Sequence, residues 1–207
     1  MTAILVFFAA MIRIRAESRS QRKTVYIFKP LGIVFILVMA VIQCPVESLY
    51  QRMILAGLIF SLAGDIFLML PKDRFIHGLL AFLIAHLFYI SGFISVLSIL
   101  SVWPFIILGL FGASVFLYLL PGLGKRRLPV LVYMLVIVVM AGLAWGVWLE
   151  KGGKAALMAA AGSVLFIISD SVLAMMRFRG KFRFSTTLKV LTYLSAQFLI
   201  ASSMCTF

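Results

Sequence analysis

The chain has 207 residues, of which 64% are hydrophobic and only 12% are charged. This composition and a mean hydropathy of +1.19 exclude a soluble globular domain and indicate an integral membrane protein. Apolar stretches recur along the whole length and leave no polar segment long enough for a separate soluble core, so residues 1–207 are expected to form one transmembrane helical domain.

The net charge of +13 comes from Lys and Arg residues that lie in short clusters between the apolar stretches. Charges beside membrane spans show this pattern, so membrane lipids are the expected partners and nucleic acid is not. The run from Ala3 to Ile12 is apolar, but Arg13 and Arg15 follow where a cleavage site of a signal peptide would lie. A cleaved signal peptide is therefore not expected.

Turn residues and charges divide the apolar sequence into eight candidate helices of about 20 residues, the length that crosses the hydrocarbon core of a bilayer. The breaks are marked by Gln43-Cys44-Pro45, Pro71-Lys72-Asp73-Arg74, Pro121-Gly122-Leu123-Gly124, Lys151-Gly152-Gly153-Lys154 and Arg177-Phe178-Arg179-Gly180. The predicted fold is all-α, with transmembrane helices at residues 2–14, 25–42, 53–70, 76–98, 102–120, 128–149, 155–176 and 187–205.

The basic residues predict the orientation of these helices, because Lys and Arg accumulate on the cytoplasmic side. Fourteen of them lie in the first, third, fifth and seventh connections, whereas the other connections hold only Arg52, Lys151 and Lys154. Both termini are therefore predicted to be exoplasmic, which also favours an even number of spans. In a bacterium, the protein would lie in the inner membrane.

Two of the six acidic residues, Asp65 and Asp170, lie inside predicted spans, and each follows a glycine, Gly57 or Gly162, by eight residues. A carboxylate is costly inside a bilayer, so an intramembrane aspartate is by default a candidate functional residue. The repeated pattern suggests two parallel four-helix repeats related by an axis along the membrane normal. The alternative is that the aspartates form structural ion pairs with lysines.

The two carboxylates are also predicted to lie at the same depth. Asp65 and Asp170 precede Pro71 and Arg177 by six and seven residues, in helices that both run toward the cytoplasmic side. At 1.5 Å per residue, each carboxylate is expected about 9 to 11 Å below that boundary. Such a pair favours one protonated group, able to act as an acid, beside one ionised group.

Other polar side chains are predicted near the same level, and each has a structural alternative. The lysines could extend to the lipid headgroups, the serines and the histidine could join neighbouring helices by hydrogen bonds, and the tyrosines could pack or anchor at the interface. These residues are Lys29, Ser61, His86, Tyr89, Ser169, Ser171, Lys189, Tyr193 and Gln197.

Several other chemistries are not indicated by the sequence. His, Cys and Glu residues do not cluster at metal-ligand spacing, a phosphate-binding glycine loop is absent, and Ser169-Asp170-Ser171 lies within a helix rather than at the sharp turn of a serine hydrolase. No metal or cofactor is expected. The two cysteines, Cys44 and Cys205, are expected to be unpaired thiols at helix ends.

The order and spacing of these motifs resemble those of the YhhN-like lysoplasmalogenase family over nearly the whole chain. The matching residues are Lys29-Pro30, Gly57 to Asp65, Phe75, Gly78-Leu79, Ala81-Phe82, His86, Tyr89, Pro129, Tyr133, Phe166, Ser169-Asp170-Ser171 and Ala196-Gln197.

This resemblance implies an eight-helix ether hydrolase that cleaves the vinyl ether of a lysoplasmalogen, a lysophospholipid, and releases a fatty aldehyde with glycerophosphoethanolamine or glycerophosphocholine. Vinyl ether hydrolysis needs an acid and an anion, the roles expected for Asp65 and Asp170. The residues expected to bind substrate or tune the pair are Lys29, His86, Tyr89, Ser61, Ser169, Tyr133, Lys189 and Gln197. The alternative function is a small proton-coupled transporter or lipid-binding membrane protein.

Overall fold

The computed structural model describes residues 2–19, 21–44, 46–70 and 73–206. These residues form eight α-helices and two short 3-10 helices, with no strand among them. The helices are α1 (Thr2–Ser18), α2 (Arg22–Gln43), α3 (Leu49–Met69), α4 (Phe75–Val96), α5 (Trp103–Leu123), η1 (Gly124–Arg126), α6 (Arg127–Lys151), α7 (Gly153–Phe178), α8 (Ser185–Ser202) and η2 (Ser203–Thr206). Each of the eight segments predicted to be helical is an α-helix among the described residues, with ends that differ by a few residues.

Six segments of the described chain are long and apolar enough to cross a membrane. They correspond to α2, α3, α4, α7, the region of α8 and one 49-residue segment, Trp103–Lys151, which contains both α5 and α6. The molecule is thus an all-helical integral membrane protein. Helix α1 is not among these six segments, and the number of spans stays a prediction.

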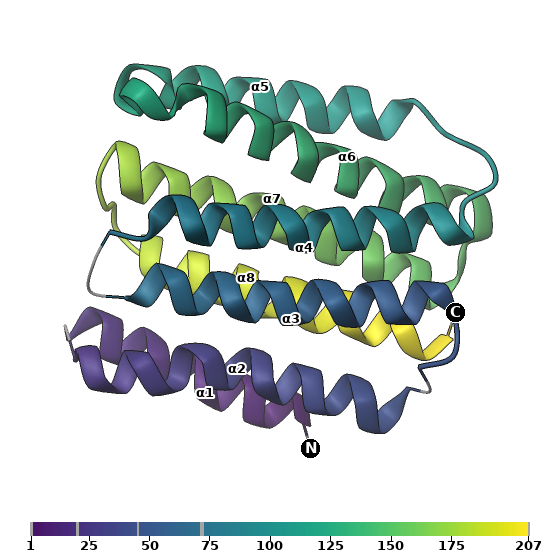
Figure 1. The fold of residues 1–207 in the computed structure, drawn as a ribbon, viewed down its shortest axis with the longest axis horizontal. Helices are drawn as coiled ribbons and strands as arrows, with labels where there is room; N and C mark the ends of the chain where they lie inside the picture. Colours follow the sequence, from purple (N-terminus) through teal and green to yellow (C-terminus); the bar gives the residue numbers. More distant parts are fainter. Residues whose placement is uncertain (1, 20, 45, 71–72, 207) are drawn as a thin grey trace.

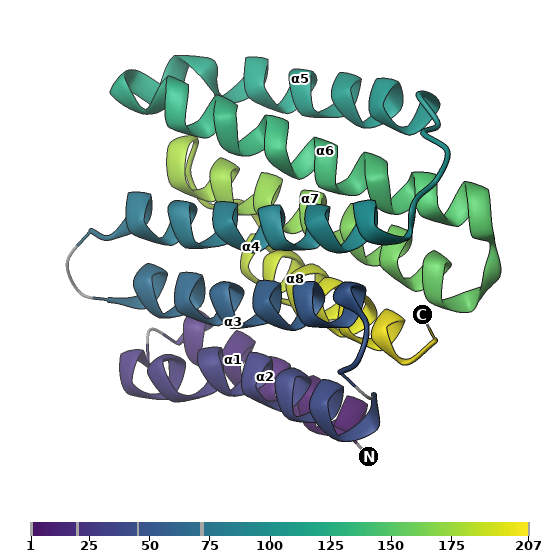
Figure 2. The same cartoon turned by 45° about the vertical axis from the view of Figure 1, so that its right-hand side comes forward.

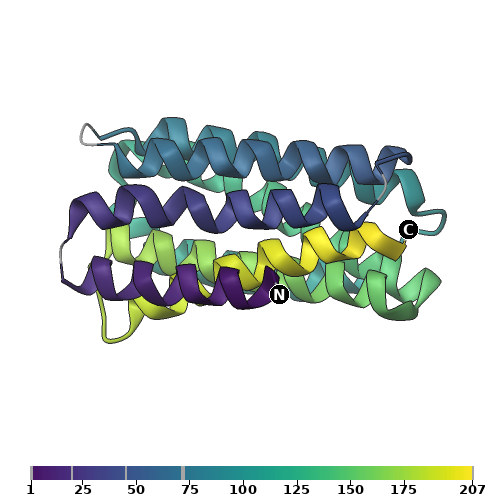
Figure 3. The same ribbon diagram turned by 90° about the horizontal axis from the view of Figure 1, so that it is seen from below.

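The helices run up and down along a common axis, so that the connections alternate between the two ends of the bundle (Figure 1). Helix α3 packs against α2 and α4 in one layer, while α1, α8, α7 and α6 pack in succession in a second layer (Figure 2). Helix α5 packs on the outside of α6 and α7, and no Cα atom of α5 lies within 8 Å of one in α4. Helix α8 leads to η2 near one end of the bundle, whereas α1 begins partway along it (Figure 3).

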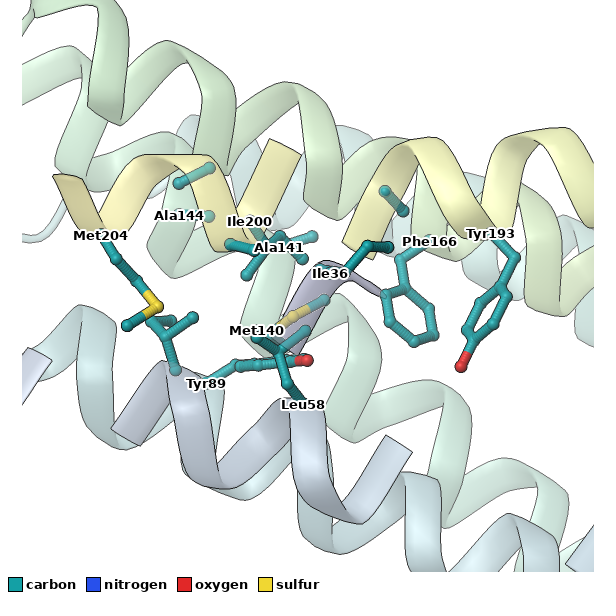
Figure 4. Close-up of a cluster of buried hydrophobic side chains, with 14 of the residues drawn as sticks. Ile36, Leu58, Tyr89, Met140, Ala141, Ala144, Phe166, Tyr193, Ile200 and Met204 are labelled. Atoms are coloured by element: carbon teal, nitrogen blue, oxygen red, sulfur yellow. The ribbon is translucent and has the colours of Figure 1, made fainter. Parts of the chain in front are cut away.

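Aliphatic and aromatic side chains fill the space between the layers, as the close-up of Leu58, Met140, Ile200 and their neighbours shows (Figure 4). Three aromatic rings contact one another edge to face in this core. The ring centroid of Phe166 lies 6.2 Å from that of Phe82 and 5.6 Å from that of Tyr193. Such edge-to-face contacts fix the rings more specifically than aliphatic packing does, and these rings connect α4, α7 and α8.

The two glycines that precede the aspartates make room for the next helix. A Cβ atom on Gly57 of α3 would lie 2.2 Å from the Tyr89 ring of α4, and one on Gly162 of α7 would lie 2.9 Å from the carbonyl oxygen of Ala196 in α8. Small residues permit such close approach of membrane helices.

The helix contacts also bear on the predicted repeat of α1–α4 by α5–α8. Helix α4 packs on α6, and α8 packs on α2. A two-fold axis between the two halves would interchange these two pairs, but the repeat itself stays a prediction.

One predicted break between helices lies where it was expected, and another lies farther along the chain. Gly152 and Gly153 have φ of +64° and +76°, a region that glycine occupies readily, and they separate α6 from α7 as expected. Helix α5 was predicted to end at residue 120, but it continues through Pro121 to Leu123 before the 3-10 turn η1. The break between α3 and α4 includes Pro71 and Lys72, which lie outside the described residues.

Cys44 and Cys205 form a disulfide, so the prediction of two unpaired thiols is wrong. Their Cα atoms lie 4.6 Å apart, although 161 residues separate them in the sequence. The bond joins the end of α2 to η2, beside a hydrogen bond of 2.6 Å between the hydroxyls of Tyr50 and Ser203. Each cysteine lies beside a helix end in the sequence, but only the packing of α8 against α2 brings these two ends together.

The disulfide leads to a test of the fold. A bond that closes so long a loop constrains the unfolded chain, so Cys44→Ser and Cys205→Ser should each lower the free energy of unfolding by about 2 to 4 kcal/mol. Thermal unfolding of the purified variants in detergent measures this loss, and a reductant should lower the midpoint of the wild-type protein only. If a thiol reagent alkylates both cysteines of the unfolded protein before any reductant is added, the disulfide does not exist.

Candidate functional site

A polar cavity with a volume of about 690 Å³ reaches into the bundle from the end that carries most of the basic residues. Asp65 of α3 and Asp170 of α7 both line it. Asp65 lies four residues before the end of α3, and Asp170 lies eight residues before the end of α7. Pro71, from which the depth of Asp65 was predicted, is outside the described residues. The two carboxylates therefore share a site, although their catalytic role stays a prediction.

Asp65 is held by a buried lysine of the neighbouring helix. The Nζ atom of Lys29 in α2 lies 3.3 Å from Asp65 Oδ1 and donates a hydrogen bond of 3.0 Å to the backbone carbonyl of Asp65. Lys29 therefore joins the site rather than extending to the headgroups. The second carboxylate oxygen, Oδ2, is buried and has no hydrogen-bond partner among the described residues. That oxygen remains available to a water molecule or a substrate.

Asp170 is held by a phenol and an imidazole from two other helices. The hydroxyl of Tyr133 in α6 donates a short hydrogen bond to Asp170 Oδ2. The Nε2 atom of His86 in α4 lies 3.0 Å from the Tyr133 oxygen and 3.8 Å from Asp170 Oδ2. Because the single hydroxyl proton of Tyr133 goes to Asp170, His86 donates from Nε2 to Tyr133. The three side chains form a directed chain of hydrogen bonds that ends on the carboxylate.

Three further predicted site residues hold the helices behind the cavity. The hydroxyl of Tyr89 donates a 2.8 Å hydrogen bond to Oε1 of Gln197, and the Ser61 hydroxyl lies 3.5 Å from the Tyr89 oxygen. These buried side chains connect α3, α4 and α8, and none of the three lines the polar cavity. Their part in substrate binding stays a prediction.

Ser169 and Lys189 both line the cavity, and each has a partner on a neighbouring helix. The hydroxyl of Ser169 donates a 3.2 Å hydrogen bond to the carbonyl oxygen of Lys189, which joins α7 to α8. The ammonium group of Lys189 lies 3.0 Å from Oε2 of Glu17 in α1. Lys189 therefore pairs with Glu17 instead of extending to the headgroups, and its part in substrate binding stays a prediction.

Cations outnumber anions in the lining of the cavity. Six basic side chains, Arg13, Lys29, Arg74, Arg177, Lys181 and Lys189, face four carboxylates, Glu17, Asp65, Asp73 and Asp170. At the rim, the backbone N–H of Phe75 and the guanidinium of Arg177 hold the pKa of Asp73 below its usual range, so this carboxylate is ionised at neutral pH. The excess of positive charge suits an anionic ligand.

A narrow apolar pocket, with a volume of about 40 Å³, adjoins the polar cavity. It lies among α4, α5, α6 and α7, where α5 stands apart from α4. The two share a wall of apolar residues and a single charged residue, Asp170, and Tyr133 lines the apolar side. Their shared apolar residues are Leu68, Phe75, Phe82 and Leu173. A polar and an apolar compartment therefore meet at one carboxylate.

Arg13, Glu17 and Tyr193 also line the cavity, although the sequence did not single out the first two and gave the third mainly a packing role. The Tyr193 hydroxyl lies beside Asp65 without meeting the geometry of a hydrogen bond. Arg13 and Glu17 are four residues apart on α1 and form an ion pair of 3.2 Å. That spacing, together with the scarcity of acidic residues, was the signal available in the sequence.

Among the described residues, no group of three or more His, Cys, Asp or Glu side chains is placed to hold a metal ion. The chemistry that the site itself offers is proton transfer between carboxylates, a phenol and an imidazole, with cations nearby.

The fold and the site define an integral membrane protein with a polar site inside its helical bundle. The chain belongs to the YhhN family, whose family model matches residues 24–204. It is 30% identical over 202 residues to the uncharacterized membrane protein YhhN of Escherichia coli O6:H1, with 97% of each chain covered. The family resemblance expected from the motifs is thus confirmed.

Several animal relatives carry an enzyme name, and two of them illustrate the match. Lysoplasmalogenase TMEM86A of Bos taurus is 33% identical over 162 residues, which cover 72% of this chain and 64% of the relative. Lysoplasmalogenase TMEM86B of Mus musculus is 34% identical over 152 residues, which cover 71% of this chain and 61% of the relative. No solved structure matches the chain.

The buried ion pair of the site predicts a strongly non-additive response to mutation. Lys29→Met should leave the Asp65 carboxylate buried without a cation and lower the free energy of unfolding by about 3 to 5 kcal/mol. The double variant Lys29→Met with Asp65→Asn removes both charges and should recover at least half of that loss. Thermal unfolding in detergent measures both, and additive losses in the double variant would show that the pair is not coupled.

Proposed function

We propose that this protein is a lysoplasmalogenase, which hydrolyses the vinyl ether bond of a lysoplasmalogen to a fatty aldehyde and glycerophosphoethanolamine or glycerophosphocholine. The observation that carries the proposal is the meeting of a basic polar cavity and an apolar pocket at Asp170. A lysoplasmalogen has a phosphate headgroup, a single apolar chain, and a vinyl ether where the chain joins the glycerol. The names of the two animal relatives agree with this substrate.

The two compartments suggest how the lipid binds. The apolar chain would enter the pocket among α4, α5, α6 and α7, which would have to widen to hold it, and the headgroup would lie in the polar cavity. The vinyl ether would then lie beside Asp170. Since α4 and α5 are not packed together, the chain could enter between them from the bilayer, and the lipid would not need to leave its leaflet.

The chemistry divides between the two aspartates. Asp65 forms an ion pair with Lys29, whereas the side-chain partners of Asp170 are a phenol and an imidazole, so we assign Asp170 as the acid. Asp170 donates a proton to the alkene carbon distal to the ether oxygen, and the adjacent carbon becomes an oxocarbenium ion. The negative charge of Asp65 stabilises this cation, as the second carboxylate does in a glycosidase. Tyr133 holds Asp170 Oδ2, so the acidic proton would be on Oδ1.

Water completes the reaction. It adds to the cationic carbon and gives a proton back to the Asp170 carboxylate, and Asp65 Oδ2, which has no partner among the described residues, would orient this water. The resulting hemiacetal collapses when its hydroxyl loses a proton and the glycerol oxygen gains one. One water molecule is consumed, and Asp170 ends in its starting protonation state.

We also propose that all eight helices cross the membrane, with both termini exoplasmic and the cavity open to the cytoplasm. The basic connections lie at one end of the bundle, in agreement with the positive-inside rule. The disulfide lies at the other end, and disulfides form on the oxidising side of a membrane. Both observations support the same orientation.

The mechanism predicts the effect of removing either carboxylate. Asp65→Asn and Asp170→Asn should each lower the turnover of lysoplasmalogen at least about a hundredfold, because acid catalysis and charge stabilisation contribute that much or more. Aldehyde release by the purified variants measures this loss. Glu47→Gln, an exposed acidic residue in the connection between α2 and α3, is the matched control and should retain wild-type turnover.

Asparagine keeps the size of the side chain and carries no charge, so Asp170→Asn is expected to fold. Asp65→Asn leaves the buried Lys29 ammonium without a counter-charge and should be less stable, so its folding is checked before its turnover is compared. Monodisperse Asp→Asn variants with wild-type turnover would refute the assignment. The transporter alternative makes no claim about aldehyde release, so wild-type protein that releases none would favour that class.

The apolar pocket predicts a dependence on chain length. Val115→Phe should fill part of the pocket and raise the KM for a long-chain lysoplasmalogen about tenfold, with a smaller effect on a short-chain substrate, because lost apolar burial costs about 0.8 kcal/mol for each CH₂ group. Leu110→Phe lies on the same helix with its side chain exposed, so it should change neither value. An equal effect of Val115→Phe on both chain lengths would argue against a chain-binding pocket.

A further inference from the structure

Arg13 of α1 is a buried cation with a donor group that is not satisfied by the described protein. The residue is 2% exposed, and it lines the polar cavity. Its Nε atom donates a 3.2 Å hydrogen bond to Glu17 Oε1, but its Nη1 atom has no hydrogen-bond partner among the described residues. A buried, unpartnered donor on a charged group is costly, so such groups usually meet a ligand, an ion or water.

Glu17 also pairs with a second cation, the ammonium group of Lys189. Its Oε2 atom accepts a 3.0 Å hydrogen bond from the Nζ atom of Lys189, while its Oε1 atom accepts the bond from Arg13. The cluster of these three residues therefore contains two cations and one carboxylate. The Lys29–Asp65 pair on the neighbouring wall of the cavity is neutral as a whole. One positive charge in this part of the cavity is left without a counter-charge.

The positions along the helices place this cluster nearer the mouth than the proposed acid. Arg13 lies five residues from the end of α1, and Lys189 lies four residues from the start of α8. At 1.5 Å per residue, both are about 6 to 8 Å from those helix ends, whereas Asp170 is about 12 Å from the end of α7. When the cluster binds an anionic group of a ligand, Asp170, which lies deeper, can contact a bond farther along that ligand.

We propose that Arg13 and Lys189 form a subsite for the phosphodiester of the lysophospholipid headgroup. Arginine presents several donors in a fixed fork that matches phosphate oxygens, and lysine adds a point charge. Glu17 positions both cations and prevents them from repelling one another. This subsite rests on the proposed function, and it gives substrate binding to α1, which precedes the residues 24–204 matched by the family model.

Binding measurements test the subsite without any turnover. The probes are a 1-acyl lysophosphatidylethanolamine below its micelle concentration, a monoacylglycerol with the same chain, and glycerophosphoethanolamine, and the readout is the Kd of each for purified protein. Wild-type protein should bind the lysophospholipid at least tenfold more tightly than the monoacylglycerol. Arg13→Gln should lose about tenfold of this preference, which corresponds to about 1.4 kcal/mol, and Arg13→Lys should recover part of it.

The matched control is Arg15→Gln, which removes an exposed arginine two residues further along α1 that does not line the cavity. It should keep the wild-type preference. If Arg13→Gln and Arg13→Lys both bind the two lipids as the wild type does, the subsite is overturned. If glycerophosphoethanolamine binds as tightly as the lysophospholipid and also depends on Arg13, the site is for a free phosphodiester and the lipid assignment is wrong.

Kinetics distinguish a failure of the subsite from a failure of the proposed function. With lysoplasmalogen as substrate, Arg13→Gln should raise KM about tenfold and change kcat less than threefold. If Arg13→Gln hydrolyses lysoplasmalogen with wild-type KM and kcat, the subsite is refuted and the proposed function stands. If the lipid preference depends on Arg13 but the protein releases no aldehyde, the proposed function is refuted and the subsite stands.

Discussion

Charged groups inside an apolar helical bundle have to be paired, because neither lipid nor hydrocarbon side chains solvate them. Three of the four carboxylates that line the polar cavity follow this constraint in different ways. Asp65 is paired with Lys29, Asp170 accepts a hydrogen bond from Tyr133, and Glu17 lies between two cations. These partners come from different helices, so the pairing also determines which helices meet around the cavity.

The packing behind the cavity allows this arrangement. Gly57 lets α4 approach α3, and Gly162 lets α8 approach α7, so that the residues carried by these four helices converge at one end of the bundle. The aromatic cluster of Phe82, Phe166 and Tyr193 lies directly beside the site. Helix α5 packs on α6 and α7 but not on α4, and the apolar pocket lies where α5 stands away from α4. The result is a site with a charged part and an apolar part, as an amphiphilic substrate requires.

The helices and many of the site residues could be predicted from the sequence, because the patterns that indicate them are local. Turn residues and charge clusters gave the eight helices, and the cost of burying a carboxylate directed attention to Asp65, Asp170 and the polar residues at their level. Lys29, His86, Ser169 and Lys189 were selected in this way, and each proved to be joined to the site or its lining.

The remaining features depend on which helices are neighbours, and no local signal encodes that. In a membrane, helices are apolar all round, so hydrophobic periodicity does not mark the buried face. The disulfide required α2 and η2 to meet, the Arg13–Glu17–Lys189 cluster required α1 to pack on α8, and the apolar pocket required the separation of α4 from α5. Each of these is a property of the packed bundle rather than of any one segment.

The central claim is that an aspartic acid at the junction of the two compartments protonates the carbon of a vinyl ether, and one experiment tests it directly. Purified protein is incubated in D₂O with a lysoplasmalogen or with its saturated ether analogue. The aldehyde is reduced at once to the alcohol, before its α-hydrogens exchange, and the deuterium content is measured by mass spectrometry. If Asp170 protonates the vinyl ether, the fatty aldehyde should carry one deuterium on the carbon next to the carbonyl, and the saturated ether should give no product. Cleavage of both ethers, or an aldehyde without that deuterium, would contradict it.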